Sequence, residues 1–509
     1  MAKKDYVIRV LASPCDVDAD AWNALLAAQT PHEAPSPFMR HEYLAAMHAS
    51  GSAVAKTGWT PRFITLWLGD VLAGACALYL KSHSYGEYVF DWAWANAYAE
   101  HGLPYYPKAL IAPPFTPVPG PRLLARSADE RVLLLQATIA WCNEQKLSSL
   151  HLLFASEDDL AACAEAGLML RHSVQFHWTN VAPTLPTSCG SLPPEGVAAP
   201  AVWQSQSRGS RSNEEPLASL GQGALVPPVV EGASDLLPLP PGEGGGFTLR
   251  LQKRLRASGQ REEGRAQPGL RSARQGSPDP CPPASAFRDF DDFLMSLNQE
   301  KRKKIRQERR KVLDAGITFR WSLGADITDA DWDFFYRCYE RTYYEHGNAP
   351  YLSRDFFTRM QRSMPGNWLL FVAEHGSASG APTAVAASLI AVSEPVHGAG
   401  PQERVAYGRY WGALARVDCL HFEACYYQPL QWCIAHGYQR FEGGAQGEHK
   451  MARALLPVKT SSAHWLAHPS FADAVERFLQ REGAGIDGYL DELDKRSPRK
   501  QLPTPPGMV

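Results

Sequence analysis

Residues 440–457, with the sequence RFEGGAQGEHKMARALLP, hold the densest group of polar side chains that could carry out chemistry. A carboxylate, an imidazole and an ammonium group follow one another there. They could act as base, proton shuttle and charge stabiliser in a transfer reaction. The candidate catalytic residues are Gln446, Glu448, His449 and Lys450. A polar loop that caps a helix without any chemistry is the alternative interpretation.

Three glycines in this segment, Gly443, Gly444 and Gly447, stand where we expect a strand to give way to a helix beginning near Lys450. Glycine allows the backbone to turn N–H groups outward at a helix start, which suits an anion or a developing oxyanion. We therefore assign the three glycines to substrate or donor binding. The segment is not a Walker loop, because the required Gly-Lys-Ser/Thr sequence is missing.

A second group of titratable side chains lies upstream, in residues 408–432, GRYWGALARVDCLHFEACYYQPLQW. Titratable groups beside aromatic rings are placed where their pKa can shift. The candidate substrate- or donor-binding residues are Arg409, His421, Glu423, Tyr426 and Tyr427. A metal centre is the rival interpretation, but His421 and Glu423 would point in different directions on a helix, and no H-E-x-x-H occurs. We expect no metal.

A basic helix is predicted over residues 298–316, NQEKRKKIRQERRKVLDAG, with eight Lys or Arg between Lys301 and Lys311. Gly316 is placed to end this helix. Its wide basic face could bind the phosphates of tRNA or of a nucleotide-bearing substrate. The candidate donor-binding residues are Lys301, Arg302 and Arg306. A solvated helix face is an equally weighted alternative.

The first third of the chain is crowded with aromatic residues, in segments such as HSYGEYVFDWAWANAY and HGLPYYPKAL. Rigid aromatic walls with Lys81, Lys108 and Arg122 could form a groove for a peptide or sugar-peptide. Plain hydrophobic core is the more ordinary explanation for such residues. Neither the G-x-S-x-G of a serine hydrolase nor a Rossmann G-x-G-x-x-G after a strand occurs.

The chain has 509 residues, 45% of them hydrophobic, with 51 Lys and Arg against 53 Asp and Glu. This composition indicates a globular protein of two or three domains and disfavours a polyelectrolyte that coats nucleic acid. The ten cysteines include no C-x-x-C pair, and the first residues lack the apolar core of a signal peptide. We therefore expect a soluble, cytoplasmic protein with reduced thiols and no membrane span.

A change of composition divides the chain. Residues 181–286 are rich in Pro, Gly and Ser, and such a segment cannot repay the entropy of ordering. We expect this insert to be disordered, apart from a short helix at residues 247–255. The expected domains are an N-terminal lobe at 1–180, the insert at 181–286, a C-terminal lobe at 287–480, and a helix and tail at 481–509.

Both lobes show the same order of predicted elements. In the first lobe, residues 64–84 predict two strands joined by a Gly-Asp turn, and residues 127–155 predict a helix followed by a strand. In the second lobe, three strand candidates precede a helix from about His421 to His436, and a further strand and helix follow. The predicted fold class is α/β, with mixed, mostly antiparallel sheets flanked by helices.

Several long segments of this sequence, in this order, resemble a known family. They are SPFMRHEYLAAM, GEYVFDWAWANAY, YYPKAL, QEKRKKIRQERRKV, HFEACYYQPLQW and FEGGAQGEHKMARALLPVKTSSAHW. Together they resemble the bacterial peptidoglycan biosynthesis and recognition family of predicted N-acyltransferases. That family is similar to the Fem-type amino-acid transferases and belongs to the GNAT superfamily. The resemblance covers about residues 36–180 and 287–479.

The resemblance implies two GNAT-like lobes and transfer of an acyl or aminoacyl group to an amine, with a peptidoglycan precursor as one acceptor. The implied donors are acyl-CoA, such as acetyl-CoA, and aminoacyl-tRNA. GNAT proteins bind the CoA pyrophosphate on a [QR]-x-x-G-x-[GA] turn, whereas residues 416–421 here contain no glycine, and the basic helix suits tRNA. A second departure is Ala454, where relatives carry glycine. A non-catalytic module that recognises a peptidoglycan precursor is the alternative function.

Overall fold

The computed structural model describes residues 5–182, 249–251, 286–376, 380–445 and 447–499. The expected disorder of the insert therefore lies almost wholly outside the described residues. Within the insert, Leu249–Leu251 forms strand β10, which pairs antiparallel with β1. The short helix expected at residues 247–255 is thus wrong at these three positions, because pairing with a sheet edge takes precedence over local propensity.

The N-terminal half contains five helices and nine strands among its described residues. The helices are α1 Ala19–Gln29, α2 His41–Ala49, α3 Trp92–Glu100, α4 Ala128–Glu144 and α5 Glu157–Glu165. The strands are β1 Tyr6–Leu11, β2 Trp59–Pro61, β3 Phe63–Leu68, β4 Val71–Cys76, β5 Leu78–Lys81, β6 Lys108–Ile111, β7 Leu124–Ala125, β8 Ser149–Leu152 and β9 Met169–Thr179. The predicted strand pair at residues 64–84 and the helix and strand at residues 127–155 are confirmed.

The C-terminal half begins with the basic helix and ends with one long helix. Its helices are α6 Phe290–Met295, α7 Gln299–Asp314, α8 Asp329–Glu345, α9 Arg354–Ser363, α10 Leu420–Phe422, α11 Gln428–Ala435 and α12 Pro469–Lys495. Its strands are β11 Ile317–Leu323, β12 Trp368–His375, β13 Thr383–Val392, β14 Val405–Ala413, β15 Arg440–Ala445 and β16 Leu456–Leu466. A π-helical turn, Glu423–Tyr427, joins α10 to α11.

Side-chain hydrogen bonds cap the first turn of several helices. Asn298 accepts a hydrogen bond from the backbone N–H of Lys301 at the start of α7, and Ser127 does the same for α4. Such a cap satisfies one of the unpaired N–H groups of the first turn. Gly316 follows α7 with φ of 73°, which confirms the predicted end of the basic helix.

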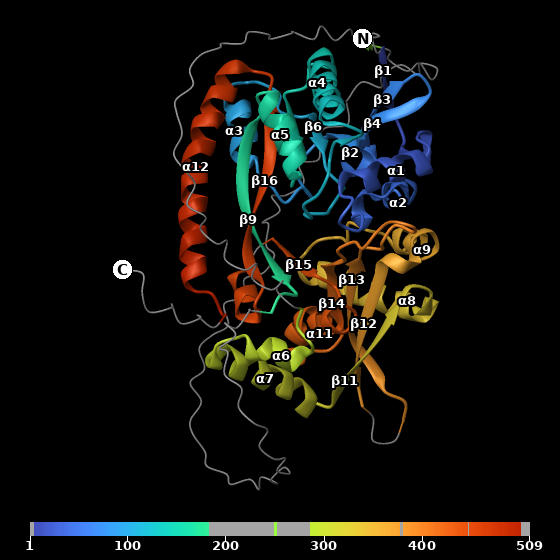
Figure 1. Cartoon of the computed structure of the whole chain (residues 1–509), viewed down its shortest axis with the longest axis vertical. Coiled ribbons are helices and arrows are strands. Elements are labelled where there is room, and N and C mark those ends of the chain that lie inside the picture. The colour runs from blue at the N-terminus through green and yellow to red at the C-terminus, as the bar shows by residue number, and fades with distance from the viewer. Residues whose placement is uncertain (1–4, 183–248, 252–285, 377–379, 446, 500–509) are drawn as a thin grey trace, which may run out of the picture.

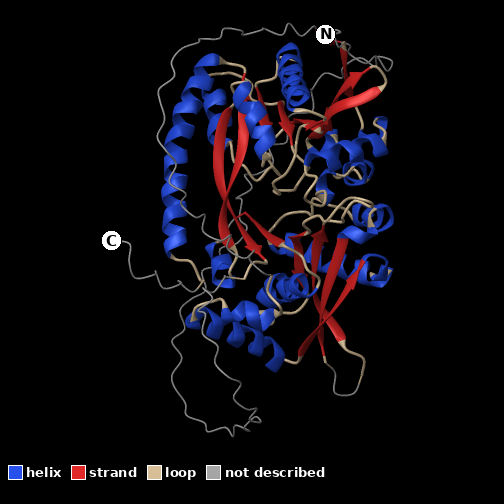
Figure 2. Cartoon of the chain, in the orientation of Figure 1, coloured by secondary structure: helices blue, strands red, loops and turns tan. Residues whose placement is uncertain are grey.

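The strands form two sheets with helices packed on them (Figures 1 and 2). The smaller sheet is antiparallel, in the order β10-β1-β3-β4-β7. The larger sheet has the order β11-β12-β13-β14-β15-β9-β16-β8-β6-β5-β2, and its parallel pairs are β14–β15 and β6–β8. The predicted α/β class, with mixed and mostly antiparallel sheets flanked by helices, is confirmed.

One feature that the sequence did not indicate is that the larger sheet runs through both halves of the molecule. Strand β9 of the N-terminal half pairs antiparallel with both β15 and β16 of the C-terminal half, and β16 also pairs with β8. Helix α12 then lies along β9 and β16 (Figure 1). The boundary expected at residue 480 would divide α12, which begins at Pro469.

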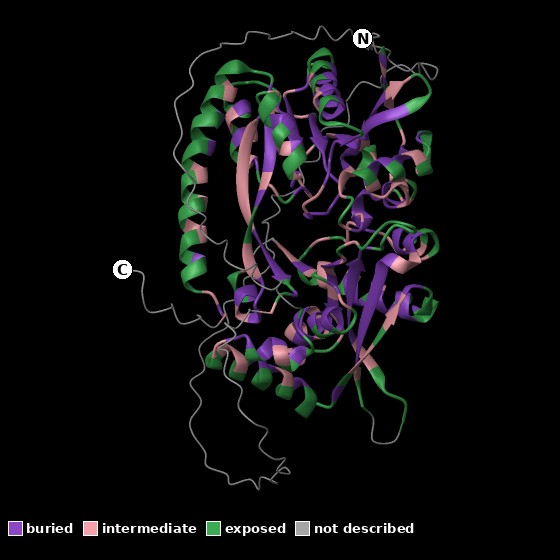
Figure 3. Ribbon diagram, in the orientation of Figure 1, coloured by how far each residue is buried: buried purple, intermediate pink, exposed green. Residues whose placement is uncertain are grey.

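The core of the C-terminal half is centred on the buried strands β12 and β13, whereas helices α7 and α12 each expose a long outer face (Figure 3). Trp178 of β9 is fully buried in this core, where its ring packs against Phe287 and Phe293. A strand of the N-terminal half thus supplies one of the largest side chains in the C-terminal core.

We predict that Trp178→Ala lowers the free energy of unfolding by about 3–5 kcal/mol, because it opens a cavity where the two halves join. Urea unfolding followed by circular dichroism measures the change. The control is Trp321→Ala, at a position that is 49% exposed on β11, which we expect to cost less than about 1 kcal/mol. A Trp178→Ala protein that unfolds in two transitions, with only one of them shifted, would contradict the continuous sheet as a single cooperative unit.

Candidate functional site

The turn after β15 contains the predicted catalytic segment, but no helix begins at Lys450. A short 3₁₀ turn, Glu448–Arg453, leads directly into β16. The expected helix is wrong because Ala454 takes a left-handed conformation, with φ of 62°, and the following residues pair with β9. The turn therefore lies between two strands of one sheet.

The glycines of this turn have the backbone freedom that the sequence suggested. Gly444 and Gly447 have φ of 77° and 92°, a region that side chains disfavour. Gly443 is required for a different reason: a Cβ atom there would lie 2.3 Å from the Leu455 side chain and 3.0 Å from the Phe176 carbonyl oxygen. Gln446 lies outside the described residues.

Lys450 stabilises the turn from within. Its side chain is buried, and its Nζ donates to the carbonyl oxygens of Gly443, at 2.6 Å, and Gly444, at 3.2 Å. Burial lowers the pKa of this ammonium group to about 8. A positive charge is thus fixed under the glycine backbone at neutral pH.

His449 is exposed beside the same turn, and its Nε2 lies 3.3 Å from the Tyr426 hydroxyl. Burial of part of the ring, together with the charges of Arg453 and Lys450, lowers its pKa from the usual value. His421 lies next to Tyr426, and burial and nearby His449 lower its pKa to about 4. Both imidazoles are therefore neutral near pH 7, and a neutral imidazole can accept a proton.

Glu448 is directed away from these histidines. Its carboxylate accepts hydrogen bonds from Tyr489, at 2.8 Å, and from Arg496, at 3.1 Å, both on or just after α12. The pair with Arg496 is about half exposed on both sides. In this arrangement Glu448 fastens the turn to α12 and is less suited to remove a proton than His449.

Two ion pairs join the basic helix α7 to the other predicted site residues. Glu308 accepts hydrogen bonds from Arg453, at 3.0 and 3.1 Å, and from the Tyr427 hydroxyl. Arg453 also donates to the His449 carbonyl oxygen, at 2.7 Å. The next residue of α7, Arg309, donates to the buried Glu423 carboxylate at 3.1 and 3.2 Å, and Glu423 also accepts from Gln428. Glu423 and Tyr427 thus position α7 against the π-helical turn.

Of the predicted phosphate-binding residues on α7, Arg306 is the most exposed. It faces Asp291 at 3.7 Å, whereas Arg302 donates to the sulfur of Met295 and Lys301 is partly covered. Lys303, Lys304 and Arg310 are exposed on the same helix. Such surface charges interact weakly with one another and remain open to a polyanion.

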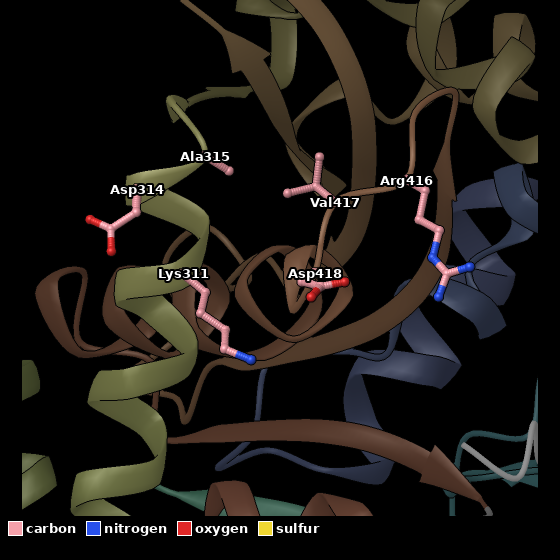
Figure 4. A pocket seen from close by; sticks show the side chains of 6 residues that line it. All are labelled: Lys311, Asp314, Ala315, Arg416, Val417 and Asp418. Atoms are coloured by element: carbon pink, nitrogen blue, oxygen red, sulfur yellow. The ribbon is translucent and has the colours of Figure 1, made fainter. Parts of the chain in front are cut away.

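A hollow beside α7 is lined by both signs of charge. Lys311, Asp314 and Ala315 line it at the end of α7, and Arg416, Val417 and Asp418 line it on the turn after β14; the Lys311 side chain points toward Asp418, whereas Asp314 and Arg416 point away from each other (Figure 4). A second hollow is lined by α7, β11, Glu423 and Gln428. Residues 443–450 line neither of these two hollows. The first coincides with the turn that the GNAT resemblance assigns to CoA, and its two acidic and two basic side chains give it no net positive charge.

Arg409 lies apart from the 443–450 turn, where the two halves meet. Its Nη2 donates to the Phe115 carbonyl oxygen at 2.7 Å, and its Nε has no partner among the described residues. Tyr88 and Tyr410 are close enough for the Arg409 charge to interact with their hydroxyl groups. Phe115 and Tyr88 have φ of 56° and 64°, unusual values that mark this junction as strained.

The groove expected around Lys81, Lys108 and Arg122 is wrong, because all three side chains are at most 1% exposed. Arg122 donates to the backbone carbonyl oxygens of Leu153 and Val118, so it ties loops together inside the N-terminal half. The lysines form part of a buried polar network that the sequence did not indicate. The available signal was that the loop between them carries two acidic residues four positions apart, Glu87 and Asp91.

Among the described residues, no three or more His, Cys, Asp or Glu are arranged to hold a metal ion. None of the described helices has the length and apolar character needed to cross a membrane.

The fold and site define a mixed α/β protein with a polar turn between two strands of a shared sheet. The chain belongs to the FemAB-like family, described as peptidoglycan biosynthesis and recognition, whose model matches residues 13–184 and 283–501. This match confirms the resemblance seen in the sequence. No curated protein sequence matches the chain.

Solved structures with a similar fold share little sequence identity with this chain. They include FemX, with 9% identity and a TM-score of 0.43, covering 90% of this chain and 98% of FemX. L-PGS from Bacillus licheniformis has 9% identity and a TM-score of 0.39, covering 88% of this chain and 98% of that one. A tandem GNAT protein from the clavulanic acid biosynthesis pathway has 9% identity and a TM-score of 0.37, covering 91% and 99%.

We predict that Gly443→Ala lowers the free energy of unfolding by about 1–3 kcal/mol, because the new methyl group overlaps Leu455 and the β9 backbone. The matched control is Gly488→Ala in α12, where a Cβ meets no atom within 4 Å. We expect that change to raise stability by about 1 kcal/mol through helix propensity. Thermal unfolding of both variants measures the difference, and equal effects would show that the turn is not tightly packed.

Proposed function

We propose that the protein is an N-acyltransferase that moves an acyl or aminoacyl group onto the amine of a peptidoglycan precursor. The observation that carries the proposal is membership of the FemAB-like family across both halves of the chain. The polar turn at residues 443–450 supports it, because the turn contains the neutral His449 and lies near the neutral His421.

In the proposed reaction the acceptor amine attacks the carbonyl carbon of the donor ester or thioester. A C–N bond forms, the C–O or C–S bond breaks, and the amine loses a proton. We assign that proton to His449, because its imidazole is neutral at pH 7 and is exposed to an incoming substrate. The proton leaves with the departing oxygen or sulfur, so no covalent intermediate on the enzyme is needed.

A chain of hydrogen bonds positions His449. Arg453 donates to the His449 carbonyl oxygen, and Glu308 accepts from both Arg453 and the Tyr427 hydroxyl. The Lys450 ammonium lies under the glycine backbone and favours negative charge developing nearby. We place Gly443, Gly444 and Gly447 around the carbonyl under attack, as the sequence suggested.

For the donor we favour aminoacyl-tRNA over acyl-CoA. The exposed lysines and arginines of α7 supply positive charge for phosphates, whereas in the hollow at residues 416–418 Lys311 and Arg416 are balanced by Asp314 and Asp418. Helix α7 also connects to the base through Glu308 and Arg453, so donor binding and base position are linked in one element.

Recognition of a peptidoglycan precursor without catalysis is the second candidate function. The observation in its favour is that residues 443–450 line neither of the two hollows beside α7. This candidate predicts precursor binding that survives His449→Ala, with no product from any donor.

We predict that transfer falls about 100- to 10,000-fold in His449→Ala, the usual loss when a general base is removed. Glu448→Gln, the control, is expected to retain most activity because its carboxylate faces α12. The rate should also fall as pH drops through the lowered pKa of His449, since the ring is then protonated. Transfer of labelled acyl groups from acetyl-CoA and aminoacyl-tRNA to a panel of precursor amines measures all three. No turnover by folded wild-type protein with either donor would refute the proposed function.

We predict that Lys303→Glu/Lys304→Glu weakens tRNA binding and lowers the slope of log affinity against log salt by about 2, one for each lost phosphate contact. The control reverses two charges on another exposed helix face, Arg477→Glu/Arg481→Glu in α12. Filter binding at several salt concentrations provides the measurement. Equal effects of the two double variants would exclude α7 as a specific tRNA surface.

A further inference from the structure

The N-terminal half contains a cluster of charged side chains from which solvent is excluded. Lys81 and Lys108 stand directly opposite each other on strands β5 and β6. Both are fully buried, and Glu87 and Asp91, from the loop between these strands, are at most 4% exposed. Burying four ionisable groups is costly unless each charge is compensated, so the bonding of each one matters.

Lys108 is completely satisfied. Its Nζ donates to Ser84 Oγ at 2.7 Å, to Glu87 Oε2 at 2.7 Å, and to Asp91 Oδ2. An ammonium group has three N–H donors, and all three are used here. Although burial acts to lower it, the two carboxylates raise the pKa of Lys108, so this lysine remains a fixed cation.

The two carboxylates, in contrast, each keep one oxygen without a partner. Glu87 Oε1 and Asp91 Oδ1 are buried, and neither accepts a hydrogen bond from any described residue. Their other oxygens are taken by Lys108, and Asp91 Oδ2 also accepts from Tyr105 at 2.6 Å. An unpaired carboxylate oxygen in the interior is a strong acceptor that calls for a donor.

Lys81 does not supply that donor. Its Nζ donates to the Tyr85 carbonyl oxygen at 3.2 Å and lies 3.6 Å from the centre of the Trp59 ring. Burial lowers its pKa to about 7, and burial raises the pKa of Glu87 to about 7. At about pH 8, above both values, Lys81 is neutral and Glu87 is ionised, so the cluster has one net negative charge and two free acceptor oxygens.

On the far side of Asp91 the cluster ends in neutral groups. Tyr105 lies 3.3 Å from His151 Nε2, and His151 Nδ1 lies 2.7 Å from His464 Nδ1 on β16. Burial and the nearby Lys108 and Arg171 charges keep the pKa of both histidines low, so neither adds a cation. Neither histidine therefore supplies a positive charge to the free carboxylate oxygens.

The loop that brings Glu87 and Asp91 to this cluster also reaches the surface. Tyr88 and Phe90 lie between the two buried acids in the sequence and are 38% and 46% exposed. Gly86 and Tyr88 have positive φ, so the loop is tightly bent beside the acidic residues. Because both acids are at most 4% exposed, a ligand reaches the free oxygens only when this segment moves, and that movement also breaks the hydrogen bond from Arg171 of β9 to the Phe90 carbonyl oxygen.

We propose that Glu87, Asp91 and Lys108 form a second binding site, which takes the primary ammonium group of a small alkylamine or of an amine-bearing peptide side chain. The ammonium donates to Glu87 Oε1 and Asp91 Oδ1, while Lys108 holds the two carboxylates in place. The site lies in the N-terminal half and differs from the 443–450 turn. It rests on bonding within the cluster and not on the proposed transferase activity.

Isothermal titration of the full chain with methylammonium chloride tests the site. We expect saturable binding to the wild-type protein and none of tetramethylammonium, which has no N–H to donate. Glu87→Gln should weaken methylammonium binding about tenfold or more, as expected for the loss of a charged hydrogen-bond partner. The matched control is Glu130→Gln, at a buried carboxylate whose two oxygens already accept from Tyr6 and Ser127.

A second measurement uses only the wild-type protein, in case Glu87→Gln does not fold. The charged groups facing Glu87 are Lys108, Asp91 and Lys81. Lowering the pH from about 8 to about 6 protonates Glu87 and Lys81, and both changes disfavour a bound cation. We expect methylammonium affinity to fall across this range. Affinity that is independent of pH, no saturable binding, or equal binding of potassium at the same ionic strength would overturn the proposal.

Discussion

The pairing of strand β9 with both β15 and β16 is the constraint on which the rest of the molecule depends. It places a strand from the first half of the chain between two strands from the last quarter. The turn at residues 447–455 leads from one of those strands to the other, and both strands are paired with the same neighbour. This arrangement explains why Gly443 has no room for a side chain: the β9 backbone at Phe176 lies directly against it.

Burial, which removes water from ionisable groups, shifts the pKa values in both polar regions, the 443–450 turn and the Lys108 cluster. Around the turn, low pKa values keep His421 and His449 neutral and bring Lys450 to about 8. In the N-terminal half, the same effect lowers the pKa of Lys81 and raises the pKa of Glu87, each to about 7. The protein therefore contains two regions with groups whose pKa lies close to physiological pH, although only one was visible as a motif.

The sequence predicted the regular elements well and the buried polar groups poorly. Hydrophobic periodicity located most strands and the basic helix, because each of these elements has one face on a core. Gly444 and Gly447 were recognised because only glycine adopts positive φ easily. Lys108 was misplaced, because a lysine next to aromatic residues is expected to lie at a surface, and only tertiary contacts bring Glu87 and Asp91 to it. The helix expected at Lys450 failed for the same reason, since pairing of β16 with β9 overrides local propensity.

The position of β16 has a consequence for how the protein is made. This strand lies between β8 and β9 in the sheet. However, β9 ends at Thr179 and β16 begins only at Leu456, some 277 residues later in the chain. The N-terminal sheet thus has an open gap on the ribosome until nearly the whole chain has emerged. Contacts so distant in sequence form slowly, and the exposed edges of β8 and β9 are available for wrong pairing in the meantime. We expect chaperone dependence during synthesis to be concentrated on this gap, and truncation before β16 to yield aggregates and not a smaller folded domain.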